Sequence, residues 1–370
     1  MAELAPGSVA RSPRSRAGYI DWLRGLAVVI MILAHAVDSW TVLGPTRHTN
    51  PYFWFMVLAG MGAPLFLWLA GLAVPLAAHA RMRRGASQAE ASWTLQKRGW
   101  QIFGLALLFR LQAYVFSAGA TLYGTLKVDI LNVMGLSLVA AGWLWGRGRT
   151  RNGRVTAALA ATIGVLVLAP LLRLWSWPAL VPDPIEWYLR PPPARSTFTL
   201  FPWSAFAFAG LALGEWLAGV TAEARDRFHA WCLAGGAGIA AASYQSSFLP
   251  TLLPGSKFWT TSPAFFSIRL GAMIAVFGLL YFLLRPGGAW SRIALPQAWS
   301  PMELLGRTSL FIYWVHVELV YGLATRRLHK ALSFNAALIA FAIFTVGMLA
   351  LAMVKSRYWD NEAPWRTRDA

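Results

Sequence analysis

Residues 19–40 read YIDWLRGLAVVIMILAHAVDSW, an apolar run long enough to cross a bilayer. Four ionisable residues interrupt it (Asp21, Arg24, His35 and Asp38), although a charge inside lipid is costly. Arg24 and His35 are separated by three helical turns plus only ~20°, and by ~16 Å along the helix axis. We therefore predict a membrane helix with a polar stripe on one face, extending from the membrane boundary into the interior.

The composition places the rest of the chain in the membrane as well. Of 370 residues, 57% are hydrophobic and 13% are charged, against about 25% charged in soluble domains. The net charge of +18 would indicate nucleic-acid binding in a soluble protein. Here most basic residues lie between apolar runs, where membrane topology explains them and no nucleic-acid partner is needed. The single cysteine, Cys232, excludes an intramolecular disulfide and a cysteine-cluster metal site.

Ten runs approach the ~20 apolar residues that a spanning helix needs. They predict an all-α polytopic membrane bundle of about ten transmembrane helices. We expect a single membrane domain over 19–354, between a tail at 1–18 and a tail at 355–370. We expect the first helix to be retained, because no small-residue cleavage site follows it. The runs are 19–38, 52–78, 99–118, 127–146, 155–175, 199–219, 229–248, 263–284, 303–325 and 332–354.

Basic residues in the tails and connections set the expected orientation. One side of the bundle has 20 Arg and Lys and the other has 7, which predicts that both termini are cytoplasmic. The segment Arg326–Lys330 lies on the minority side and fits this topology least well. The longest outer connection, 176–198, is rich in Pro and Trp. We favour a rigid cap for it over the lining of an external mouth.

Other polar side chains fall inside the predicted spans and are candidates for a functional site. Asp129 and Asn132 share a helix face, as do Ser309 and Tyr313, and Tyr313 and His316. The alternative is structural: Arg110, Asp129 and Arg269 would pair with one another, Arg24 would reach the interface, and His35 would be a hydrogen-bonded core residue. Glu215 and Glu318 lie near span ends, where we expect solvent. The candidates are Arg110, Asp129, Asn132, Arg269, Arg307, Ser309, Tyr313 and His316.

The segment IDWLRGLAVVIMILAH (20–35) resembles the opening signature of the transmembrane acyltransferase superfamily, in which an arginine precedes a histidine by eleven positions. Six further segments are similar, in the same order, to the heparan-α-glucosaminide N-acetyltransferase-like branch, so the resemblance covers about 19–325. They are APLFLWLAGLAVPLA (63–77), KRGWQIFGLALLFR (97–110), KVDILNVMGLSLV (127–139), FPWSAFAFAGLALG (201–214), SPAFFSIRLGAM (262–273) and LLGRTSLFIYWVHVELVYG (304–322).

This resemblance implies acyl transfer. The donor would be cytoplasmic acyl-CoA, with acetyl-CoA as the family default, and no metal is expected. The acceptor would be a hydroxyl or amine of an envelope glycan or small molecule at the outer side of a membrane, which we expect to be the bacterial inner membrane. The resemblance makes Arg24 a contact of the CoA phosphates and His35 the catalytic histidine. Membrane lipids are expected partners, and the oligomeric state stays open.

The remaining candidates are assigned around these two residues. Arg98 and Arg307 would add positive charge at the donor mouth, and Arg110, Asp129 and Arg269 are further donor-site candidates. Asp38, one turn beyond His35, would accept an imidazole N–H. Asn132, Tyr313 or His316 would donate to the oxyanion. His35 would act as a general base or form an acyl intermediate. A transporter or lipid-linked-substrate translocator is the alternative, although the halves show no convincing repeat.

Overall fold

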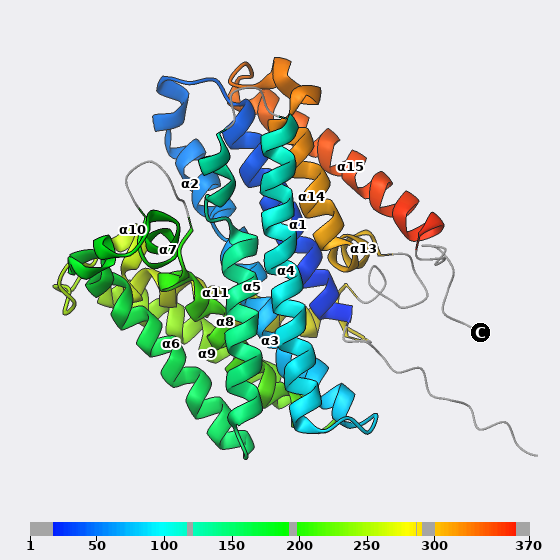
Figure 1. The fold of residues 1–370 in the computed structure, drawn as a ribbon. Helices are drawn as coiled ribbons and strands as arrows, with labels where there is room; N and C mark the ends of the chain where they lie inside the picture. The colour runs from blue at the N-terminus through cyan, green and yellow to red at the C-terminus, as the bar shows by residue number, and fades with distance from the viewer. Residues whose placement is uncertain (1–17, 117–120, 192–197, 286, 291–299, 360–370) are drawn as a thin grey trace, which may run out of the picture.

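The computed structural model describes residues 18–116, 121–191, 198–285, 287–290 and 300–359. Over these residues the chain is helical, and its extended pairing is limited to one bridge between Thr41 and Leu332. Figure 1 shows long helices packed side by side, with shorter helices and turns at their ends. The predicted all-α membrane-type bundle is therefore confirmed.

Each predicted apolar run is mostly helical where the structure describes it, and two of the runs are broken. The second run divides between α2 and α3, and the ninth divides at Thr308 between α13 and α14. The principal helices are α1 (Gly18–Trp40), α2 (Asn50–Ala59), α3 (Gly62–Met82), α4 (Gln88–Phe116), α5 (Ile130–Arg147), α6 (Arg151–Leu174), α8 (Leu200–Ala218), α9 (Arg225–Ser246), α11 (Pro263–Leu284), α13 (Pro301–Arg307), α14 (Ser309–Tyr321) and α15 (Phe334–Tyr358).

Within the described residues, seven helical segments are long and apolar enough to cross a membrane: α1, α2 with α3, α5, α6, α8, α11 and α15. Three other predicted runs do not reach this threshold. The helices α4 and α9 begin with polar and charged turns, and α14 has only 13 residues. The protein is an integral membrane protein, whereas ten crossings and two cytoplasmic termini stay predictions.

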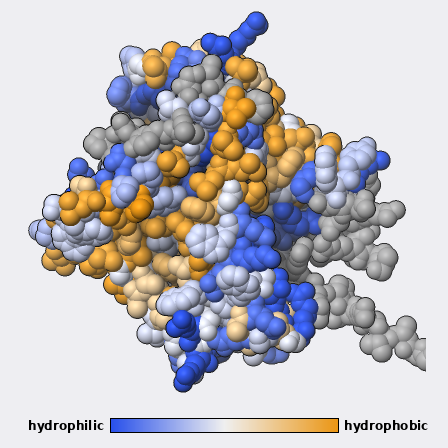
Figure 2. Space-filling model, viewed as in Figure 1, coloured by the Kyte–Doolittle hydropathy of each residue, from blue (hydrophilic) through white to orange (hydrophobic). Residues whose placement is uncertain are grey.

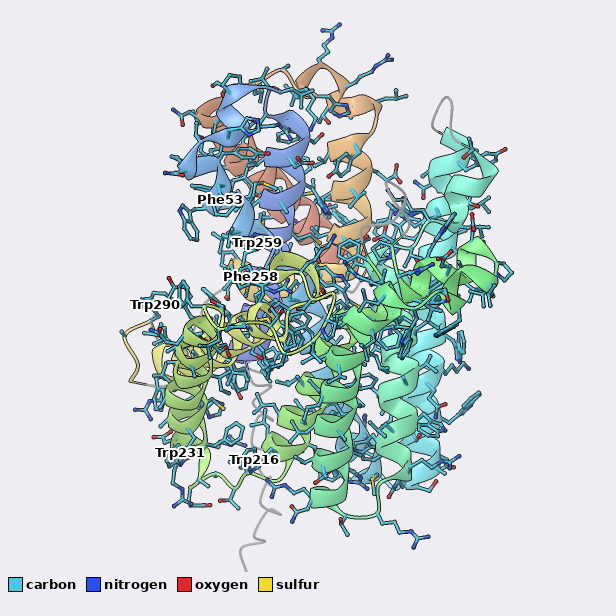
Figure 3. All side chains as sticks on the ribbon, turned by 90° about the vertical axis from the view of Figure 1, so that its left-hand side faces the viewer. Phe53, Trp216, Trp231, Phe258, Trp259 and Trp290 are labelled. Atoms are coloured by element: carbon cyan, nitrogen blue, oxygen red, sulfur yellow. The ribbon has the colours of Figure 1, made fainter. Side chains whose placement is uncertain are left out.

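The surface agrees with a membrane location. Figure 2 shows hydrophobic residues across the middle of the molecule and hydrophilic residues mostly at its upper and lower ends. In Figure 3, the labelled exposed aromatic side chains lie at several heights, with Phe53, Trp259 and Phe258 in the upper half, Trp290 below them and Trp216 and Trp231 near the lower end. Tryptophan is enriched where membrane proteins meet the interfaces of a bilayer.

Glycines allow α3 and α8 to pack with their backbones in contact. A Cβ atom on Gly71 would lie 1.9 Å from the carbonyl oxygen of Ala207, and one on Gly210 would lie 2.0 Å from that of Trp68. Small residues at such a crossing let membrane helices approach closely. The sequence spacing of Gly210 and Gly214 suits such a contact, and Gly214 also packs against the backbone of Leu72 in α3. The spacing of Gly235 and Gly238 in α9 suits one equally, but there the contact is made by Gly236, against α11.

We expect Gly71→Ala to destabilise the protein by about 1–3 kcal/mol, because a methyl group would overpack the α3–α8 contact. Unfolding of the purified protein in detergent, followed by tryptophan fluorescence, measures the change. Gly104→Ala in α4 is the matched control, because a Cβ there meets nothing within 4 Å. Equal unfolding midpoints for Gly71→Ala and the wild type would contradict the close contact.

The connection after α6 folds over the end of the bundle. It contains the short helices η3 (Trp177–Leu180) and α7 (Asp183–Leu189). Trp187 is 2% exposed, and Arg190 donates to Glu186 and to the carbonyl oxygen of Trp175. These contacts fit the rigid cap that the sequence favoured over the lining of an external mouth. Residues 192–197, part of the same predicted connection, lie outside the described residues.

Candidate active site

A cavity of about 900 Å³ lies between α1, the α2–α3 junction, α4, α5, α13 and α14. This is at the upper end of the range for small-molecule pockets, roughly 300–1,000 Å³. Its apolar wall includes Met31, Phe66, Ile102, Phe109 and Leu310. Its polar wall contains most of the ionisable residues that the sequence placed inside spans. The ionisable side chains in the whole lining are those of Arg24, His35, Arg98, Arg110, Lys127, Asp129, Arg307, Tyr313, Glu318 and Tyr321.

The polar stripe predicted on α1 faces this cavity. Arg24 and His35 both line it, as their angular spacing required. Nη1 of Arg24 lies 3.2 Å from Oδ1 of Asp21, which is one turn earlier in the same helix. Gly306, one residue before Arg307, packs against the backbone of Asp21 and Gly25. Arg307 is therefore next to the helical turn that carries Arg24.

The lining carries a positive charge. Among the described lining residues, five cationic side chains contribute to it, from Arg24, Arg98, Arg110, Lys127 and Arg307, against the two carboxylates of Asp129 and Glu318. Walls of low dielectric constant concentrate the field of such a charge distribution. The cavity is therefore suited to an anionic ligand, and the arginines can donate two hydrogen bonds at once to phosphate oxygens.

Arg110, Asp129 and Tyr313 form one polar group in the cavity wall. Nη2 of Arg110 lies 2.7 Å from Oδ2 of Asp129, and the Tyr313 hydroxyl donates to Oδ1 at 3.0 Å. Asp129 also caps the N-terminus of α5. The pairing that the sequence left as a structural alternative is thus present for Arg110 and Asp129, at the edge of the cavity. The Tyr313 hydroxyl is engaged with a carboxylate in this arrangement.

His35 and His316 form a hydrogen-bonded pair at the cavity wall. Nδ1 of His35 lies 2.8 Å from Nε2 of His316, and the two ring planes are within 3° of each other. His35 is partly exposed to the cavity, whereas His316 is 0% exposed and lies behind it. Nδ1 of His316 contacts the carbonyl oxygen of Ile312 at 2.7 Å. Both nitrogens of His316 are therefore in use, which removes the predicted hydrogen bond from His316 to an oxyanion in the cavity.

Asp38 does not form the predicted contact with His35. Its carboxylate pairs with Arg47 at 3.0 Å and approaches Lys330 at 4.0 Å. Arg47 and Lys330 also donate to backbone carbonyl oxygens at the end of α1. Burial lowers the pKa of Lys330; the attraction of Asp38 opposes this shift, and the repulsion of Arg47 adds to it. These bonds show that two of the basic residues on the minority side are held by local contacts.

Two further predicted site residues lie outside the cavity lining. Asn132 is 1% exposed, and its side-chain oxygen accepts from the backbone N–H of Asp129 in the cap of α5. Arg269 stacks against the rings of Trp203, Phe206 and Phe265 instead of pairing with Asp129. Capping explains Asn132 and cation–π contacts explain Arg269. Both side chains serve the fold at these positions.

Part of the cavity wall was not predicted from the sequence. Lys127, Glu318 and Tyr321 line it, and the ring of Tyr321 is 5.6 Å from that of His35. We expected solvent at Glu318 because it is near a span end. A signal for it was present, since Glu318 and Tyr321 are one turn apart and share a face of α14. Among the described residues, no cluster of three His, Cys, Asp or Glu side chains could hold a metal ion.

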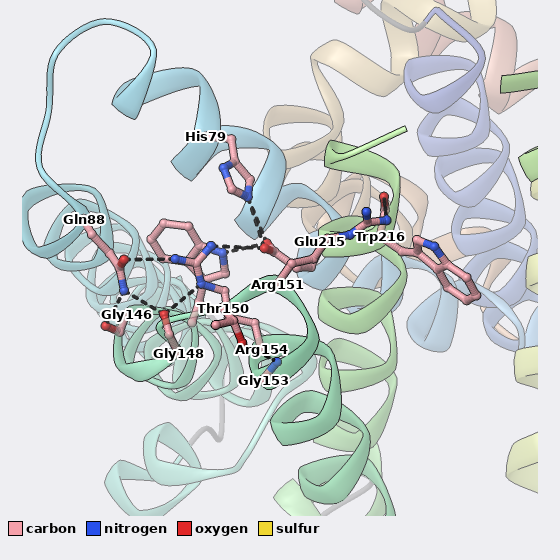
Figure 4. Close-up of polar contacts among 11 residues, drawn as sticks. His79, Gln88, Gly146, Gly148, Thr150, Arg151, Gly153, Arg154, Glu215 and Trp216 are labelled. Carbon is pink, nitrogen blue, oxygen red and sulfur yellow. Dashed lines mark hydrogen bonds and ion pairs between the residues drawn. The ribbon is translucent and has the colours of Figure 1, made fainter. Parts of the chain in front are cut away.

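A second polar network lies away from the cavity, and it corrects the solvated position predicted for Glu215. Glu215 is 2% exposed, and Figure 4 shows His79 and Arg154 directed towards it. Its hydrogen bonds join α8 to α3, α5 and α6. It accepts hydrogen bonds from Nε2 of His79, Nε1 of Trp145 and Nη1 of Arg154, at 3.0, 2.8 and 3.1 Å. Arg154 also donates to Gln88 and to the carbonyl oxygen of Gly148. The network fixes the helix ends.

Together these features define a polytopic membrane protein whose helices enclose a positively charged cavity with a histidine in its wall. The family model of the heparan-α-glucosaminide N-acetyltransferase catalytic domain matches residues 16–239, well over half of the chain. The chain therefore belongs to this family of membrane acetyltransferases. A comparison with curated proteins gave no match. The matched residues include Arg24, His35, Arg98, Arg110 and Asp129, whereas α13 and α14 lie beyond them.

Proposed function

We propose that the protein transfers an acetyl group from cytoplasmic acetyl-CoA to a hydroxyl or amine of an acceptor on the outer side of the membrane. The observation that carries this proposal is a single cavity lined by both a cluster of cations and His35. Acetyl-CoA is a polyanion with a reactive thioester, so it needs cations for its phosphates and a base near its thioester. Membership of an acetyltransferase family supports the same chemistry.

Arg24, Arg98 and Arg307 hold the phosphates of the donor in this proposal. All three line the cavity. Arg24 and Arg307 come from neighbouring turns of α1 and α13. Arg24 is also ~16 Å along α1 from His35, a separation that a long donor such as acetyl-CoA can span. The excess of basic residues on the Arg24 side supports entry of the donor from the cytoplasm.

His35 acts as the general base in direct transfer. Its ring takes the proton of the acceptor hydroxyl or amine while the acceptor oxygen or nitrogen attacks the thioester carbonyl carbon. The carbon–sulfur bond then breaks, and the imidazolium returns the proton to the CoA thiolate. The products are CoA and an acetyl ester or amide. An acetyl-His35 intermediate is the other route, and it would release CoA before any acceptor is added.

The acceptor enters from the end of the cavity lined by Glu318 and Tyr321. The Glu318 carboxylate can accept hydrogen bonds from hydroxyl or ammonium groups, and the Tyr321 ring offers a face for stacking. Both groups suit an envelope glycan or a similar polyhydroxylated molecule. A bacterial inner membrane is the proposed location. A transporter would use the same charged cavity without chemistry, so the two functions differ in whether CoA appears as a product.

We expect acetyl-CoA and CoA, but not ATP, to raise the unfolding temperature of the purified protein, because a ligand that binds only the native state stabilises it. Arg24→Ala should weaken CoA binding by about tenfold or more, since a hydrogen bond to a charged group contributes ~1.5–3 kcal/mol. A thermal-shift titration measures both effects.

Asp21→Asn separates the loss of the ion pair from the loss of the phosphate contact. Arg83→Ala is an exposed control outside the cavity lining. The absence of any shift with CoA would favour the transporter.

A further inference from the structure

We propose that His316 is a positioning residue that holds His35 in the tautomer with its proton on Nδ1, leaving the lone pair of Nε2 directed to the cavity. This inference rests on the proposed function, because it gives His35 the protonation state that a general base needs. It gives His316 a different role from the oxyanion contact that its sequence position suggested.

The carbonyl oxygen of Ile312 determines which nitrogens carry protons. A carbonyl oxygen can only accept, so Nδ1 of His316, 2.7 Å away, must donate. In a neutral imidazole the other nitrogen is then an acceptor. Nε2 of His316 therefore accepts from Nδ1 of His35 across 2.8 Å. The near-coplanar rings direct the N–H of one along the lone pair of the other.

Burial keeps His316 neutral, and its neutrality fixes which of the two histidines donates the hydrogen bond between them. The ring is 0% exposed, and its partners are a carbonyl oxygen and His35. A charge at such a position would cost several kcal/mol unless it were paired. A doubly protonated His316 would also force His35 into the opposite tautomer, with Nε2 carrying the proton. That tautomer could not accept a proton from an acceptor in the cavity.

The arrangement also supports the charged state that forms during transfer. When Nε2 of His35 takes the acceptor proton, Nδ1 keeps its own proton and its hydrogen bond to His316. The imidazolium then donates a charge-assisted bond, which is stronger than the bond between neutral rings. His316 itself neither gains nor loses a proton. It acts through His35 and does not contact the reacting atoms.

Two amide substitutions separate this role from packing. In His316→Asn, the amide can still donate to the Ile312 carbonyl, but no acceptor remains where Nε2 was. In His316→Gln, the longer amide can place its oxygen near the former Nε2 position. We expect His316→Asn to lower kcat by ~10²-fold without changing the KM for acetyl-CoA. We expect His316→Gln to recover most of that loss.

His229 provides a matched control elsewhere in the bundle. Its ring is also 0% exposed, its Nδ1 contacts the carbonyl oxygen four residues earlier, and its Nε2 contacts the Tyr19 hydroxyl. It is not among the residues that line the cavity. His229→Asn imposes the same loss of an imidazole on a buried site, and we expect it to leave kcat unchanged. An equal loss in His229→Asn and His316→Asn would overturn the proposal.

The tautomer itself can be read without measuring activity. Two-bond proton–nitrogen correlation spectra of protein labelled with ¹⁵N in its 6 histidines distinguish an Nδ1-protonated from an Nε2-protonated ring. We expect His35 to be Nδ1-protonated in the wild type and to change its tautomer population in His316→Asn. An Nε2-protonated His35 in the wild type would overturn the proposal, whether or not the variants fold. The absence of acetyl transfer alongside the expected tautomer would instead count against the proposed function.

Discussion

His35→Ala is expected to lower the rate of acetyl transfer by about 10²–10⁴-fold, the range that a positioned general base contributes. The variant loses the imidazole that faces the cavity beside Tyr321. The phosphate contacts proposed for Arg24, Arg98 and Arg307 remain. Stabilisation by CoA should therefore persist in His35→Ala. The variant should lose turnover only.

An assay that follows transfer of the label from radiolabelled acetyl-CoA, with CoA release followed in parallel, tests this prediction. CoA release without an acceptor would indicate an acetylated His35. His229→Asn is the control for damage to a buried histidine. A His35→Ala protein that folds, inserts and turns over at the wild-type rate would remove His35 from the mechanism, whatever CoA does to its stability.

The parts of the site that the sequence predicted lie within single helices. Arg24 and His35 share a face because helical geometry fixes their angular relation without reference to any neighbour. Ionisable residues inside apolar runs also identified Arg110, Asp129, Arg307 and Tyr313, and the predicted side of the membrane identified Arg98. All five line the cavity. Lipid penalises such residues unless a cavity or a partner receives them, so their presence was informative before the fold was known.

The partners of these residues could not be predicted, because they depend on how helices pack. His35 has Asp38 one turn away in sequence, yet its partner His316 comes from α14. The choice depends on the rotation of α14 against α1, which short sequence patterns do not encode. The same limit applies to the glycines of α9. Their spacing indicated a close contact, but the face that meets α11 carries Gly236.

Glu215→Ala is expected to destabilise the protein by about 3–5 kcal/mol, because removal of one partner leaves a buried charge uncompensated. Arg154 would remain with its side chain 8% exposed and without this carboxylate. Nε1 of Trp145 would also lose its acceptor. The four helices that the carboxylate joins are α3, α5, α6 and α8, so the loss affects tertiary packing more than any single helix.

A second substitution tests whether the uncompensated charge of Arg154 causes the loss of stability. Replacing both ionic partners by apolar residues of similar size is often neutral or stabilising. Glu215→Leu combined with Arg154→Leu should therefore be more stable than Glu215→Ala alone. Unfolding midpoints in detergent compare the variants. Asp226→Ala, which removes an exposed carboxylate beside Arg285, should match the wild type.

The acetyl-transfer activity of Glu215→Ala shows whether the Glu215 network affects the active site or only the stability of the fold. Glu215 and Arg154 are not among the residues that line the cavity, so the fraction of Glu215→Ala that stays folded should transfer acetyl groups at the wild-type rate. A lower kcat per folded molecule would mean that the network sets the shape of the cavity through α3, α5 and α8. Unchanged stability would mean that water enters to solvate Arg154, and that the helix ends are fixed by packing such as the Gly71–Ala207 contact.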